Sequence, residues 1–147
     1  MAELHPFFVH FPIALLMVAA LFDVYGAFRD LKQHMVTAHI LQLIAAVSAI
    51  LAAVTGNLSE SVIVAQEALH QGVAEAFDAH VSWGNALVWV IVLVALGRTF
   101  AVLEKKTWPT QGWVFPLVST GLAFLILITG LLGGDLSREI LLYFQLN

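Results

Sequence analysis

The chain has 147 residues, of which 61% are hydrophobic and only 11% are charged. A soluble domain carries about 25% charged residues, so this composition indicates one integral membrane domain over residues 1–147. The lack of cysteine excludes disulfides, iron–sulfur clusters and covalently attached c-type haem, and the net charge of -4 provides no basic surface for nucleic acid.

Four segments are long and apolar enough to cross a bilayer, which takes about 20 helical residues. The spans are predicted at about residues 6–28, 35–58, 79–100 and 112–134. The first span lacks the basic region of a signal peptide, so we expect it to be retained. The predicted fold class is therefore all-α, a transmembrane four-helix bundle with both termini on the same side.

The positions of lysine and arginine set the expected orientation. Arg29 and Lys32 lie in the first connection, and Arg98, Lys105 and Lys106 flank the inner end of the third span. Loops rich in Lys and Arg remain in the cytoplasm. We therefore expect a protein of the bacterial inner membrane, with both termini and the long second connection on the outer side.

The second connection, from Ser59 to Asp78, carries apolar residues at helical spacing. They are Val62, Ala65, Leu69, Val73 and Phe77. This spacing predicts an amphipathic helix on the outer surface, or an extension of the third span towards its N-terminus. His80 continues the apolar stripe and should point into the bundle, whereas His70 should lie at its rim or face water.

Four of the six histidines fall at the outer ends of the apolar segments: His5, His10, His70 and His80. Ionisable side chains inside a membrane are costly and commonly functional. His10 and His80 are expected at similar depths on different helices, the arrangement of two axial ligands of a haem. We predict haem b with His10 and His80 on its iron, and His5 and His70 as their hydrogen-bonding partners or as alternate ligands.

Aromatic residues near these histidines are available to line a haem pocket: Phe7, Phe8, Phe11, Phe77 and Trp83. Small residues make a smooth face on the second and fourth spans. They are Ala45, Ala46, Ala49, Ala52, Ala53 and Gly56 on the second span, and Gly130, Gly133 and Gly134 on the fourth. Such faces allow helices to pack closely in lipid, and they equally leave a slot for a flat macrocycle.

The inner half of the bundle contains fewer candidate functional residues. His34 lies in the basic connection and is expected to be solvated, and His39 is expected to cap its helix or reach towards the interface. Asp23 is expected to pair with Arg29 or Lys32.

Two other functions fit the same residues. The outer histidines, aided by Asp135 or Glu139, would hold copper or zinc in a metal-binding or transport-associated protein. Alternatively, the chain is a structural or assembly subunit that docks into a larger membrane complex. The leading prediction is a protein of the lipid bilayer that transfers electrons near the outer face, with a quinone or a periplasmic redox protein as its partner. The sequence leaves open whether the protein forms a homo-oligomer. No hydrolytic triad is evident, so an enzyme is not predicted.

The opening run His5-Pro6-x-x-Val9-His10-Phe11-Pro12, with the glycine-rich end of the last span, resembles the bacterial membrane family catalogued as domain of unknown function 2231. This resemblance covers essentially the whole chain and implies a compact four-span protein with His5 and His10 at motif positions. In architecture alone, the chain is also similar to four-helix b-type membrane cytochromes with bis-histidine haem. Those cytochromes often hold two haems, and this chain lacks an inner histidine pair.

Overall fold

The computed structural model describes residues 4–64, 71–104 and 112–146. These residues form the helices α1 (Leu4–Arg29), α2 (Lys32–Val64), α3 (Gln71–Leu103) and α5 (Val114–Leu146). Each helix contains a stretch that is long and apolar enough to cross a membrane: His5–Arg29, Lys32–Leu58, Glu75–Leu103 and Val114–Glu139. The predicted all-α fold with four candidate spans is confirmed.

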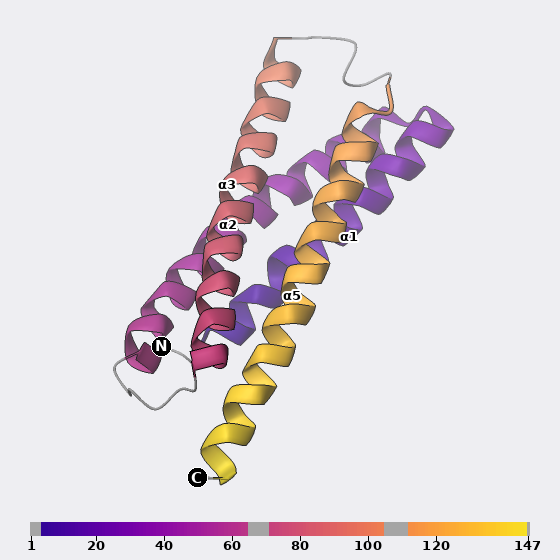
Figure 1. Ribbon diagram of the computed structural model, residues 1–147. Coiled ribbons are helices and arrows are strands. Elements are labelled where there is room, and N and C mark those ends of the chain that lie inside the picture. The colour runs from indigo at the N-terminus through magenta and orange to yellow at the C-terminus, as the bar shows by residue number, and fades with distance from the viewer. Residues whose placement is uncertain (1–3, 65–70, 105–111, 147) are drawn as a thin grey trace.

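The helices run alternately up and down in a four-sided bundle (Figure 1). Both α1 and α3 pack on α2 and α5, so α1 and α3 face each other across a diagonal of the bundle. The start of α1, the end of α2, the start of α3 and the end of α5 lie together at what we call the terminal end. The opposite end, where α1 leads into α2, is called the turn end.

The surface of the bundle is apolar on its outward faces. Leu21, Leu93 and Leu131, from three different helices, are 69%, 65% and 63% exposed. A helix that is apolar all the way round is typical of a membrane span, because its outward side chains contact lipid rather than water. The outward leucines therefore place the bundle in a lipid bilayer.

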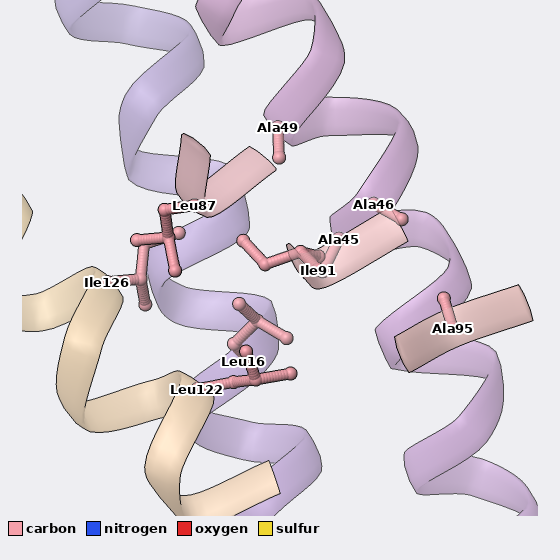
Figure 2. Close-up of a cluster of buried hydrophobic side chains, with 9 residues drawn as sticks. All are labelled: Leu16, Ala45, Ala46, Ala49, Leu87, Ile91, Ala95, Leu122 and Ile126. Atoms are coloured by element: carbon pink, nitrogen blue, oxygen red, sulfur yellow. The ribbon is translucent and has the colours of Figure 1, made fainter. Parts of the chain in front are cut away.

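The apolar core lies midway between the two ends of the bundle. Figure 2 shows its residues: Leu16 from α1, Ala45, Ala46 and Ala49 from α2, Leu87, Ile91 and Ala95 from α3, and Leu122 and Ile126 from α5. Leu16 and Ile91 are completely buried. The small side chains of α2 allow the larger ones of α1 and α3 to pack closely against its backbone. At this height, the alanine face of α2 serves helix packing.

The second connection differs from the predicted surface helix. Residues 59–64 continue α2, residues 71–78 form the first turns of α3, and residues 65–70, which include His70, lie outside the described part of the chain. Apolar residues at helical spacing give the same sequence pattern whether they form a separate helix or extend a span. Residues 71–78 extend the third span, which was the alternative expectation.

Candidate functional site

A cavity of about 520 Å³ occupies the terminal end of the bundle, next to the apolar core. All four helices contribute to its wall, which consists mainly of aliphatic side chains, alanines and glycines. Its size lies within the usual range of small-molecule and cofactor sites, roughly 300–1,000 Å³. Within the described part of the chain, no Asp, Glu, Lys or Arg lines it.

Three of the four histidines predicted for the site line this cavity. His5 and His10 come from α1, and His80 comes from α3 across the diagonal. The fourth, His70, falls outside the described residues. The structure therefore brings together three histidines that are far apart in sequence, on two helices that face each other.

The ring of His5 is held against α2. Its Nδ1 lies 2.9 Å from the carbonyl oxygen of Ala52. Because a carbonyl only accepts, Nδ1 must carry the proton and donate it, which leaves Nε2 available for another partner. The same ring lies directly over Gly56, where an added Cβ would stand 2.9 Å from His5 Cε1. The absence of a side chain at Gly56 is thus what gives the His5 ring its place.

His10 is oriented by its own helix. Its Nδ1 donates to the carbonyl of Pro6, one turn earlier on α1. As at His5, this bond leaves Nε2 available. An imidazole whose other nitrogen donates to a carbonyl is the usual arrangement of a metal-ligating histidine, because the bond fixes both ring orientation and tautomer.

His80 packs against α5. Contacts with α5 allow the position of His80 along the bundle axis to be compared with that of His10. An added Cβ at Gly133 would stand 2.6 Å from His80 Cε1, and one at Gly130 would stand 2.6 Å from Ile13 Cδ1. Gly133 is three residues beyond Gly130 towards the terminal end, and His10 is three residues beyond Ile13 in the same direction. Each step is about 4.5 Å at 1.5 Å per residue. His10 and His80 therefore stand at similar heights along the bundle.

Small residues on the two remaining helices line the cavity between these histidines. They are Ala49, Ala52, Ala53 and Gly56 on α2, and Gly130, Gly133 and Gly134 on α5. Gly84, one turn beyond His80 on α3, also lines the cavity, and an added Cβ there would meet nothing within 4 Å. The small faces thus pack against neighbouring helices at the height of the core and line an open cavity next to it.

The aromatic lining expected from the sequence is mostly not there. Of the five candidates only Phe77 lines the cavity. Phe11 and Trp83 lie outside its wall and are 45% and 73% exposed, and Phe7 packs edge-to-face on Phe11 with the ring centroids 5.1 Å apart. These rings are on the outward side of their helices, so the cavity wall is aliphatic instead of aromatic.

A polar corner of the cavity was not predicted. Asn57 of α2 and Asn85 of α3 both line it and exchange reciprocal amide hydrogen bonds of 3.4 and 3.3 Å. Asn57 directly follows Gly56, the residue against which the His5 ring packs. The corner therefore joins side chains of α2 and α3. Sequence pattern offered only isolated polar residues in apolar spans as a signal for it.

A second polar cluster lies at the turn end, below the apolar core. Arg98 of α3 donates to both carboxylate oxygens of Asp23 on α1, at 2.6 Å each. Gln42 of α2 accepts from Arg98 at 3.4 Å, and Ser119 of α5 donates to Asp23 at 2.5 Å. The expected pairing of Asp23 with Arg29 or Lys32 is therefore wrong. Asp23 and Arg98 are buried at a junction of all four helices, where an unpaired charge would be very costly.

The two remaining histidines also differ from expectation. His34, expected to be solvated, is half-buried, stacks on Phe22 and meets the edge of Tyr25, with ring centroids 5.6 and 5.1 Å away. His39 neither caps its helix nor reaches for the interface: its Nε2 lies 3.3 Å from Thr99 Oγ1 on α3. The prediction failed because both lie on faces of α2 that the neighbouring helices cover.

A copper or zinc site needs at least three protein ligands close together. Within residues 4–64, 71–104 and 112–146, no group of three or more His, Cys, Asp or Glu side chains is close enough to hold a metal ion. The cavity histidines are thus not gathered as such a site requires, whereas a haem iron takes only two.

The model of the family described as "Predicted membrane protein (DUF2231)" matches residues 2–144. No curated protein and no solved structure matches the chain.

Proposed function

We propose that this chain, which belongs to the DUF2231 family of predicted membrane proteins, binds a b-type haem in the cavity at its terminal end and transfers electrons there. His10 and His80 are the proposed axial ligands. The observation that carries the proposal is that both histidines line one cavity, from helices that face each other across the bundle.

The small residues of α2 and α5 support this proposal. With His10 on α1 and His80 on α3 as the residues that would hold the iron, a haem bound between them would extend towards α2 and α5. Those two helices present alanine and glycine to the cavity. The helices without a proposed ligand are therefore the ones that leave room for a flat ring.

The residues of the cavity have clear tasks in this function. When bound, the haem iron supplies a one-electron carrier. The bond from His10 Nδ1 to Pro6 holds that imidazole in one orientation and makes its Nε2 a better ligand. The aliphatic wall, which includes Val88 and Ile91, excludes water and thereby helps to set the redox potential.

We propose that the protein lies in the bacterial inner membrane with its terminal end, and so both termini, on the outer side. Arg29 and Lys32 flank the turn end, where α3 also ends, and Lys105 and Lys106 come shortly after α3 in the sequence. Arg98 is not counted in this excess of basic residues at the turn end, because its side chain is buried in an ion pair. A quinone or a periplasmic redox protein would then exchange electrons at the outer face.

The test is an absorption spectrum of protein purified in detergent after expression with ample haem, oxidised and then reduced with dithionite. We expect a low-spin spectrum whose α-band sharpens on reduction. His10→Ala and His80→Ala should each abolish it, and His34→Ala at the turn end should retain it. A normal spectrum from both ligand variants would refute the assignment, and a featureless spectrum of the unsubstituted protein would refute the function.

A second variant separates lost ligation from lost folding. His80→Gly leaves a hole next to Gly133 into which free imidazole fits. Adding imidazole to this variant should restore a low-spin spectrum. Failure of imidazole to restore it, in protein that remains helical and monodisperse, would argue against His80 as an iron ligand.

A further inference from the structure

We infer that the corner formed by Asn57 and Asn85 binds a carboxylate of the tetrapyrrole, one of its two propionates. This inference rests on the proposed haem function and adds to it the group by which the protein recognises its cofactor. It concerns a part of the cavity that has no contact with the iron in the proposal above.

The need for such a site follows from the charge of the ligand and of the cavity. Haem carries two propionate groups, and a carboxylate taken from water without hydrogen-bond donors is strongly destabilised. Within the described residues, no Lys or Arg lines the cavity. Neutral donors must therefore solvate a propionate that enters it.

Few cavity side chains can provide those donors. His10 and His80 are assigned to the iron, and the Thr129 hydroxyl donates to the carbonyl of its own helix at Leu125, 2.9 Å away. Ser137 lies on α5, across the bundle from α2, and has a single hydroxyl hydrogen, whereas the two asparagines together carry four amide hydrogens. The remaining donors are the amide groups of Asn57 and Asn85, which come together from α2 and α3, because the ring proton of His5 is already donated to Ala52.

The geometry of the two asparagines suits a carboxylate. Their mutual bonds of 3.4 and 3.3 Å are longer than the usual 2.9–3.0 Å of an N–H···O bond, so they are weak and easily exchanged. Each amide nitrogen carries two hydrogens, so even in the paired state each asparagine retains one N–H for another acceptor. Hydrogen bonds to an ionised carboxylate are about twice as strong as neutral ones. A propionate would therefore be a better partner for this pair than its own two amides.

The experiment compares haem with its dimethyl ester, in which both carboxylates are neutralised. Apo-protein in detergent is titrated with each compound, and the ratio of the two dissociation constants is taken as the carboxylate preference. We expect the unsubstituted protein to prefer haem about tenfold or more. Because detergent takes up the ester more readily, only the change of this ratio between variants is interpreted.

Asn57→Leu and Asn85→Leu, singly and together, should weaken haem binding and leave ester binding within about twofold, so the double variant loses the preference. Thr37→Val, whose hydroxyl bonds its own helix at the turn end and which is outside the cavity wall, should retain it. A double variant whose ratio of dissociation constants equals that of the unsubstituted protein overturns the inference. If the unsubstituted protein binds neither compound, the proposed haem function itself is refuted. For each variant, retained binding of the ester shows that the protein is folded.

Discussion

Asp23 and Arg98 form a buried ion pair across the diagonal of the bundle, with two guanidinium–carboxylate contacts of 2.6 Å. They belong to α1 and α3, the same two helices that carry His10 and His80 at the opposite end. A bidentate pair has a narrow range of geometries. The pair at the turn end therefore fixes the relative heights of α1 and α3, and with them the match between the two histidines.

Removal of one partner of this pair should be strongly destabilising. Arg98→Met leaves the Asp23 carboxylate buried without its counter-charge, and we expect a loss of about 3–5 kcal/mol in the free energy of unfolding. The double variant Asp23→Leu with Arg98→Met should recover most of that loss, since no charge remains buried. Denaturant titration in detergent micelles measures both. Exposed Arg138→Met is the control, and a loss at Arg98 no larger than this control's would contradict the prediction.

Two neighbouring glycines on α5 should differ sharply. A Cβ at Gly133 would stand 2.6 Å from the His80 ring, whereas a Cβ at Gly134 would meet nothing within 4 Å. Gly133→Ala should displace the ring and weaken haem retention about tenfold or more, while Gly134→Ala should leave it unchanged. Spectra and haem-to-protein ratios of the two purified variants provide the comparison. Equal behaviour would show that contact with Gly133 does not position His80.

Filling the cavity should exclude the cofactor without unfolding the protein. Gly84 lines the cavity, and a Cβ there would meet open space. We expect Gly84→Phe to insert into the cavity, keep the helical content and lose haem. Gly121→Phe is the matched control, because Gly121 is also open but is outside the cavity wall. Haem retention by Gly84→Phe at the level of the control would mean that the ligand lies elsewhere.

The chain contains no cysteine, so single cysteines report its orientation directly. Asp135→Cys lies near the terminal end and Lys32→Cys at the turn end, and both positions are exposed. We expect a membrane-impermeant maleimide applied to intact spheroplasts to label the first variant and not the second. Permeabilised cells should label both. The reverse pattern would invert the proposed orientation.

The four spans and the gathering of histidines at one end could be predicted from the sequence. Long apolar runs must be helical in lipid, since only internal hydrogen bonds can satisfy their backbone. Alternating direction then places the outer ends of the first and third spans, with His5, His10 and His80, at the same end. The polar corner of Asn57 and Asn85 was not predicted, because it depends on the height at which α3 packs on α2.

The sequence by itself thus determined which four segments of the described chain form long apolar helices and which residues lie at each end, because hydrophobicity and backbone hydrogen bonding act locally. Only the tertiary structure decided which side of each helix faces inward. In a soluble helix the polar face marks the outside, but here lipid accepts apolar side chains as readily as the interior does. Phe11 and Trp83 therefore looked as suitable for the cavity as Phe77 did, although they are largely exposed. Asp23 could likewise be assigned its partner, Arg98, only once packing had rotated and aligned α1 and α3.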